Sequence, residues 1–364
     1  MARKERSAKH VLACPIRIVD EFAMPSNVTI VIPTYNRPRQ LDRQLNFLEY
    51  AKNQFPVIVV DGTNEAATRE LNRGVAKRHP SVQMRQYEQD RHFGLRISDG
   101  AKAADTEYVL VSADDDFAFP PAIRECADFL DAHPDYSAAI GETFALSYNL
   151  SRPVTRHGFA ILDRLNTGTA PNQPRFLQRS MWYFAYTTLG YIPLFYSLRR
   201  AEEVATSFGN VTPVMKHSST ELITNSLLLI HGRVAVLPIP FGLRDYSSEP
   251  IREAIRQGET QSWPEEDLAH IRPLLVEAVA EREHLAPEMA GYVIDVHLEQ
   301  WSRDIQMRST VSNQPPMRYQ RFARLLQIAL SIVSPRRLAN QVSIDPDIIL
   351  ALRRAHVDYC RGQA

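Results

Sequence analysis

The sequence of 364 residues has few cysteines, no long apolar run and no excess of charge of either sign. Its three cysteines, Cys14, Cys126 and Cys360, lie too far apart for a metal-binding spacing or a disulfide framework, which fits a reducing, cytoplasmic environment. No apolar run approaches the roughly 18 residues that a membrane-spanning helix needs. The formal net charge of zero gives no reason to expect a nucleic acid as a partner.

Familiar signatures of nucleotide and metal sites are missing as well. No G-x-G-x-x-G follows the first predicted strand, which excludes the usual dinucleotide fingerprint. The segment from Gly94 to Lys102 does not match a P-loop, because five residues separate its glycines and Ala101 precedes the lysine. No H-E-x-x-H is present, and the eleven histidines are scattered.

The residues that follow a tail at 1–26 predict alternating strands and helices. Continuous apolar runs at 28–32, 57–60 and 108–111 are typical of buried parallel strands. Further strands are predicted at 82–87 and 136–140, and helices at 39–52, 65–78, 94–104 and 120–132. This β-α-β-α-β-α-β order predicts a doubly wound, Rossmann-like α/β sheet.

The most informative stretch is E-Y-V-L-V-S-A-D-D-D-F-A-F-P at residues 107–120, where an apolar strand ends in Asp114, Asp115 and Asp116. Open α/β sheets bind ligands at the carboxyl ends of their strands. Carboxylates suit Mg²⁺ and Mn²⁺, so the triplet is either a solvated acidic turn or a metal site that faces a diphosphate. Residues 33–37 and Asp61 also follow strands, and their convergence on the same crevice favours a nucleotide site.

Three segments taken in order, V-T-I-V-I-P-T-Y-N-R, V-I-V-V-D-G-T and T-E-Y-V-L…D-D-D-F, resemble the family 2 glycosyltransferases, which have the GT-A fold. The last segment, with Gly94 and Arg96 upstream, is also similar to the ganglioside-type N-acetylgalactosaminyltransferases. The resemblance implies a Rossmann-like GT-A domain at 27–246 that binds a nucleotide-diphosphate sugar, with a UDP-sugar the first expectation. The pattern of residues 247–364 predicts a helical C-terminal domain.

The resemblance also implies roles for individual residues. Nucleotide contacts are expected from Pro33, Thr34, Tyr35 and Asp61, and phosphate contacts from Arg37 and Arg96. The acidic triplet corresponds to the D-x-D motif that holds Mg²⁺ or Mn²⁺. Because Ser112 and Ala113 stand where the family has leucine and a first aspartate, the register of the ligands is open. Asp114 and Asp116 are the preferred ligands, with Asp115 the alternative.

Inverting enzymes of this kind use a carboxylate well downstream of D-x-D as the general base. Glu221 meets this description at a predicted helix start, and the alternative is a charge that only complements the positive end of the helix. Glu202 and Glu203 follow two arginines and look like surface charges. Arg244 and Tyr246 follow the last predicted strand and would either close over the diphosphate or lie in a surface loop.

Two features outside these motifs allow two interpretations each. The aromatic residues Trp182, Tyr183, Phe184 and Tyr186 could stack on sugars, but core packing is preferred. A basic amphipathic helix at 317–336 could lie on an anionic membrane, giving peripheral contact at its inner face. Packing within the C-terminal domain, or a contact between copies in a homo-oligomer, is the preferred alternative.

The sequence thus predicts a metal-dependent, inverting glycosyltransferase that acts on a hydroxyl of a glycan, lipid-linked or protein acceptor, in glycan or surface polysaccharide synthesis. One alternative is a nucleotidyltransferase acting on sugar phosphates, although the loop P-T-Y-N-R-P is not the glycine-rich loop such enzymes need. The other is a catalytically degenerate transferase domain that serves in assembly.

Overall fold

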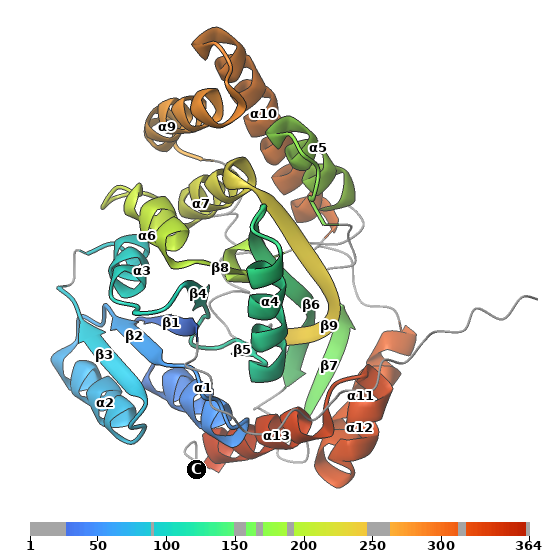
Figure 1. Cartoon of the computed structure of the whole chain (residues 1–364). Coiled ribbons are helices and arrows are strands. Elements are labelled where there is room, and N and C mark those ends of the chain that lie inside the picture. Colours follow the sequence, from blue (N-terminus) through green and yellow to red (C-terminus); the bar gives the residue numbers. More distant parts are fainter. Residues whose placement is uncertain are drawn as a thin grey trace, which may run out of the picture.

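The computed structural model describes residues 27–88, 91–148, 158–164, 170–187, 193–245, 263–311 and 318–361 (Figure 1). Side chains are described for these residues except 162–164, 185–187, 304–311 and 318–325. The predicted tail at 1–26 and Tyr246 lie outside the described residues, as does the side chain of Tyr186.

Nine strands of the described chain form one mixed sheet in the order β3-β2-β1-β4-β8-β6-β9-β5, with β7 paired to β6 (Figure 1). The strands are β1 (Val28–Thr34), β2 (Val57–Asp61), β3 (Val82–Gln86), β4 (Tyr108–Val111), β5 (Phe117–Ala118), β6 (Tyr136–Tyr148), β7 (Phe159–Arg164), β8 (Leu198–Arg200) and β9 (Arg233–Asp245). Strands β1 to β4 are parallel, which confirms the Rossmann-like half. Strand β8 runs antiparallel to both β4 and β6, so it joins the two halves of the sheet.

The parallel strands are buried because apolar residues on both faces of the sheet pack against helices. Ile30 and Ile32 of β1 face α1 (Pro38–Tyr50), whereas Val31 faces α3 (Phe93–Lys102) and α6 (Ala201–Gly209). Burying one such side chain fully contributes about 1.5–3 kcal/mol. Helix α2 (Ala66–Lys77) packs beside α1 and β3. The continuous apolar runs therefore reflect a sheet that is covered on two sides.

The remaining helices are α4 (Pro120–Ala132), α5 (Phe176–Thr187), α7 (His217–His231), α9 (Glu265–Glu283), α10 (Pro287–Val311), α11 (Arg318–Val333), α12 (Pro335–Val342) and α13 (Pro346–Arg361), with a 3₁₀ turn at Leu194–Tyr196. The C-terminal helices, α9 to α13, form two groups. Helices α9 and α10 pack on α7 and α5, while α11 packs on β7 and α13 on α1 (Figure 1).

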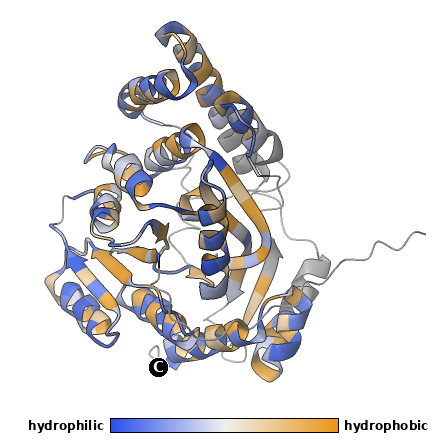
Figure 2. Cartoon of the chain, in the orientation of Figure 1, coloured by the Kyte–Doolittle hydropathy of each residue, from blue (hydrophilic) through white to orange (hydrophobic). Residues whose placement is uncertain are grey.

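These C-terminal helices share the hydrophobic core of the sheet domain. Ile271 of α9, Ile294 of α10 and Leu352 of α13 are fully buried in the same cluster as the sheet residues. The coloured parts of these helices carry both hydrophobic and hydrophilic residues (Figure 2). None of the helices in the described ranges combines the length and apolar character needed to cross a bilayer.

Two open interpretations are settled for the residues described. Tyr183 and Phe184 are buried, and both rings pack against Trp301 of α10, which confirms core packing for this pair. The described C-terminal part of α11 packs on β7, where Ser331 Oγ accepts a hydrogen bond of 3.0 Å from the Phe159 N–H. That part of the helix is therefore a packing element.

Candidate active site

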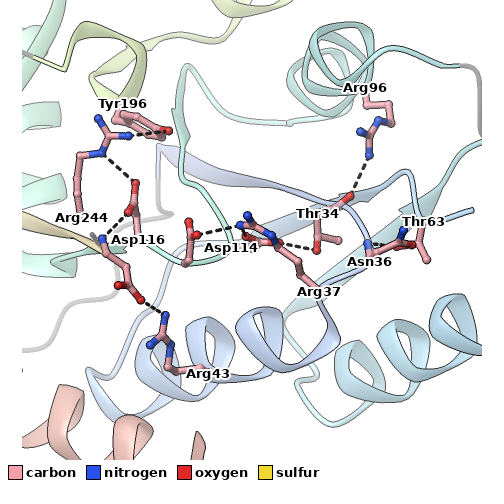
Figure 3. Close-up of polar contacts among 12 residues, drawn as sticks. Thr34, Asn36, Arg37, Arg43, Thr63, Arg96, Asp114, Asp116, Tyr196 and Arg244 are labelled. Atoms are coloured by element: carbon pink, nitrogen blue, oxygen red, sulfur yellow. Dashed lines mark hydrogen bonds and ion pairs between the residues drawn. The ribbon is translucent and has the colours of Figure 1, made fainter. Parts of the chain in front are cut away.

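Polar residues gather where the parallel strands end. In the sheet register Thr34 of β1 lies beside Asp61 of β2, which in turn lies beside Gln86 of β3. Strand β4 runs parallel on the other side of β1, and its chain continues into the acidic triplet. The predicted convergence at one edge of the sheet is therefore present (Figure 3).

The three carboxylates of the triplet are buried. Asp114, Asp115 and Asp116 are 4%, 4% and 8% exposed, so the alternative of a solvated acidic turn is wrong. The Thr34 hydroxyl donates to Asp114 Oδ2 at 2.8 Å. Arg37 Nη1 donates to Asp114 Oδ1 at 3.0 Å and to Asp115 Oδ2 at 2.8 Å, so two carboxylates share a single guanidinium (Figure 3).

Asp116 is held from the opposite side by the end of β9. The main-chain N–H of Asp245 donates to Asp116 Oδ1 at 3.0 Å, and Arg244 Nε lies 3.4 Å from Oδ2. The Arg244 guanidinium also stacks over the Tyr196 ring, 4.5 Å from its centroid (Figure 3). Arg244 thus lies against the triplet, and the alternative that it belongs to a surface loop is wrong.

Burial raises the pKa of two carboxylates in this cluster. It raises the pKa of Asp114 to about 7, with the nearby charge of Asp115 as the next cause. Burial likewise raises the pKa of Asp116 to about 7, and Arg244 opposes the shift. Because these carboxylates have lost water, an additional cation beside them would be strongly favoured.

The donor set has the chemistry of a hard cation site but is not gathered around one point. Among the residues that the structure describes, no three His, Cys, Asp or Glu side chains enclose a common position suited to a metal ion. Arg37 and Arg244 occupy carboxylate oxygens instead. Asp114 and Asp116 supply the oxygen ligands that Mg²⁺ and Mn²⁺ prefer, so the residues fit an ion that takes further ligands from a diphosphate.

On the far side of Thr34, Asp61 organises the loop that follows β2. Its Oδ1 accepts hydrogen bonds from the Thr63 N–H at 2.9 Å and from Asn72 Nδ2 at 3.2 Å. Its Oδ2 accepts one from Gln86 Nε2 at 3.0 Å. Asp61 is therefore a buried residue that shapes this wall, whereas Tyr35, 46% exposed, presents a ring at the edge.

Arg96 of α3 is turned toward the strand ends. Its Nη1 donates to the carbonyl oxygens of Thr34 at 3.0 Å and of Val60 at 3.3 Å. Burial lowers its pKa, with Asp61 acting in the opposite direction. Pro33 lies within β1 itself. Thr34 therefore lies between two positive charges, that of Arg37 on the triplet side and that of Arg96 on the β2 side (Figure 3).

Glu221 lies on α7, and its charge reaches Tyr196 beside the triplet. The helix begins at His217, so Glu221 is its fifth residue, and the helix-dipole effect falls off within the first turn. This placement argues against a charge that only complements the helix end. Burial raises the pKa of Tyr196 well above its usual value, and the negative charges of Asp116 and Glu221 act on the same phenol. His217 Nε2 lies 3.7 Å from Glu221 Oε1.

Three residues near the triplet were not predicted as site residues. Tyr196 lies under Arg244, and Arg43 of α1 pairs with Asp245 at 2.6 Å. Nothing local marks these residues, since Arg43 reads as one polar position of an amphipathic helix.

Comparisons with known proteins show which family and which solved structures this chain is similar to. Residues 29–192 match the family model described as glycosyl transferase family 2. The structure of S. aureus TarS residues 1–349 in complex with UDP-GlcNAc is similar at 14% identity and a TM-score of 0.50, covering 92% of each chain. The mannosyltransferase PcManGT from Pyrobaculum calidifontis, in complex with GDP-Man and Mn²⁺, is 14% identical with a TM-score of 0.40, covering 91% of this chain and 87% of that one.

No protein with a curated description matches the sequence. The family match covers β1, β2, β4 and the acidic triplet, which are the segments that form the site edge. The likeness to TarS extends the agreement in fold beyond these segments. Residues 29–192 therefore match glycosyl transferase family 2, and the chain has the GT-A fold.

Proposed function

We propose that this enzyme is a metal-dependent, inverting glycosyltransferase that moves a sugar from a nucleotide-diphosphate sugar to a hydroxyl acceptor. The observation that carries the proposal is the buried cluster of three carboxylates, Arg37 and Arg244 at the carboxyl ends of the strands. The charge of Glu221 of α7 acts on the phenol of Tyr196, over which Arg244 of this cluster stacks. Such an arrangement separates the groups that would bind a diphosphate from the group that would take a proton.

The donor would lie across the ends of β1, β2 and β4. Arg37 and Arg244 supply positive charge where the diphosphate would lie, and guanidinium groups match phosphate oxygens well. Tyr35 offers an exposed ring to the base, and Asp61 fixes the loop beside it. A UDP-sugar is the donor that we propose, with UDP-GlcNAc the first to test because the TarS structure of the same fold contains it.

Asp114 and Asp116 would hold Mg²⁺ or Mn²⁺, with Asp115 the alternative ligand. When bound, such an ion stabilises the negative charge that develops on the departing nucleoside diphosphate. The pKa of both preferred ligands is raised to about 7, which means that their charged forms need a cation for compensation. Arg37 bonds to two of the three carboxylates and so provides that positive charge within the chain itself.

Glu221 is the proposed general base. As the acceptor oxygen forms a bond to the anomeric carbon, the bond from that carbon to the phosphate oxygen breaks, and Glu221 takes the acceptor proton. Attack from the face opposite the leaving group inverts the configuration. The acceptor would approach between α7 and the triplet and would be a hydroxyl of a glycan, a lipid-linked sugar or a protein.

Calorimetric titration with nucleoside diphosphates tests the proposal. UDP, GDP, CDP and dTDP are titrated with and without Mn²⁺ into the wild type, the double variant Asp114→Asn/Asp116→Asn, and the control Asp128→Asn on the exposed face of α4. We expect Mn²⁺-dependent binding of UDP that only the double variant loses. Equal affinity in the double variant, or release of pyrophosphate from a nucleoside triphosphate and a sugar phosphate, would overturn the proposal.

A further inference from the structure

A buried network behind the triplet joins it to the C-terminal helix α13. Asp245, the last residue of β9, lies at its centre. Its main-chain N–H donates to Asp116 Oδ1, while its carboxylate Oδ2 accepts hydrogen bonds of 2.6 Å from Arg43 Nη2 and from the Tyr148 hydroxyl. The side chains of Arg43 and Asp245 are 1% and 0% exposed. One residue thus connects a fully buried ion pair to a carboxylate of the triplet (Figure 3).

Two aromatic residues, Tyr148 and Tyr359, complete the network around Arg43. Arg43 Nη1 donates to the Tyr148 hydroxyl at 2.8 Å, so that hydroxyl accepts from Arg43 and donates to Asp245. Burial raises the pKa of Tyr148 well above its usual value, so the phenol keeps the proton that it donates. The guanidinium of Arg43 lies 4.6 Å from the centroid of the Tyr359 ring.

Helix α13 fixes this arrangement from outside. Arg39 Nη2 donates to the Tyr359 carbonyl at 2.9 Å, and the Tyr50 hydroxyl donates to Asp358 Oδ2 at 2.7 Å. These contacts tie α13 along α1, so the ring of Tyr359 covers Arg43. The position of Arg43 therefore depends on a helix more than 300 residues later in the chain.

We propose that Arg43 is a positioning residue for Asp116 and that α13 belongs to the donor-binding machinery. This inference rests on the proposed function, since it takes the triplet as the metal and diphosphate site. Asp245 holds one oxygen of Asp116, and Arg244, its neighbour in sequence, lies against the other. Fixing Asp245 thus fixes both partners of Asp116. A buried ion pair adds little net stability compared with apolar packing, but it specifies geometry.

Two buried tyrosines, Tyr148 in the network and Tyr108 of β4 outside it, provide matched variants. Tyr148→Phe and Tyr108→Phe each remove one phenol hydroxyl that donates to an aspartate, at 2.6 and 2.7 Å, but only that of Tyr148 contacts Asp245. We expect Tyr148→Phe to raise the Kd of UDP with Mn²⁺ about tenfold and to speed hydrogen exchange of the Asp245 amide. Tyr108→Phe should leave both quantities unchanged.

Arg43→Lys and Arg43→Met provide a rescue series. Lysine keeps the charge but cannot bond to both Tyr148 and Asp245 in the planar geometry of arginine. The Kd of UDP for Arg43→Lys should therefore lie between the values for the wild type and for Arg43→Met. Thermal unfolding of every variant identifies any that does not fold, and Tyr148→Phe keeps the shape of the ring.

Each outcome of these binding measurements supports or overturns the positioning role of Arg43. A wild-type Kd in Tyr148→Phe, with or without faster amide exchange, would overturn the positioning role, and an equal loss in Tyr108→Phe would reduce it to a general effect of losing a buried hydroxyl. In both cases the wild type still binds UDP, so the proposed function stands. A wild type that binds no nucleotide would instead overturn the proposed function and, with it, this inference.

Discussion

The guanidinium of Arg96 lies against Gly62, so close that a Cβ built on this glycine would overlap its Nη1, Cζ and Nη2 atoms. Only glycine leaves room for the cation at the end of β2. Arg96 in turn donates to the carbonyls of Thr34 and Val60, which ties the ends of β1 and β2 together. The glycine therefore decides where a positive charge lies in the site.

Gly62→Ala should displace Arg96 and weaken donor binding. Losing hydrogen bonds from a charged group costs about 1.5–3 kcal/mol, so we expect a lower melting temperature and a Kd for UDP raised about tenfold or more. Gly74→Ala in α2 is the control, because no atom of the described residues beyond the helix's own backbone lies within 4 Å of a Cβ there. It should raise stability by about 0.5–1 kcal/mol without affecting binding. Wild-type affinity in Gly62→Ala would show that Arg96 is not needed.

Glu221→Gln should bind UDP and Mn²⁺ normally and lose turnover by about 10²–10⁴-fold, because glutamine keeps the shape but cannot take a proton. Glu202→Gln, on the exposed face of α6, is the matched control and should keep its turnover. Donor binding, melting temperature and rate are measured on the same preparation. Turnover that survives in Glu221→Gln would mean that another group takes the proton.

Stability of the metal-free protein should fall as the pH rises from about 4 to about 7. Asp114 and Asp116 have a pKa of about 7 in the fold, above the value of about 3.9 in an unfolded chain. Within this window the folded state retains protons that the unfolded state has released, so the free energy of unfolding decreases with pH. Asp114→Asn should flatten the pH dependence of the melting temperature, and identical curves for variant and wild type would contradict the assignment.

Metal affinity should have the opposite pH dependence. Because Mn²⁺ binds the charged carboxylates, its Kd in the presence of UDP should decrease as the pH rises toward 7 and then level off. Titrations at several pH values measure this directly. A Kd that does not change between pH 5 and pH 8 would show that neither carboxylate loses a proton on binding.

The protein should stay in the supernatant when it is mixed with anionic liposomes. Ile328 and Ser331 of α11 are buried against β7, so at least this part of the helix is occupied by packing. Co-sedimentation at low and high salt tests the expectation, since binding to anionic lipid through basic residues weakens with ionic strength. Salt-sensitive sedimentation would restore the membrane interpretation of this helix.

Features that depend on local sequence could be predicted. The apolar runs of β1, β2 and β4 are buried on both faces, and each ends in the polar residues that form the site edge. Strand β6 was expected over residues 136–140 and extends to Tyr148. Its second half pairs with β9 through register shifts, a long-range arrangement that alternation of residues along one strand does not reveal.

The electrostatics of the triplet depend on distant partners and could not be predicted. Arg37 lies 77 positions before Asp114, and Asp245 lies 129 positions after Asp116. These partners turn what reads as an exposed acidic turn into a buried cluster with raised pKa values. Arg43 was missed for the same reason, because its burial depends on Tyr359.

The contact between α1 and α13 also has a consequence for the order of events during protein synthesis. Arg39 and Tyr359 are 320 positions apart, yet their hydrogen bond holds the ring that covers Arg43. Domains generally begin to fold from the N-terminus while the chain is being made. The Rossmann-like strands can therefore pair early, but the ring of Tyr359 can cover Arg43 only after that residue has left the ribosome. A nascent chain stalled before that point should have a sheet and still lack a finished donor site.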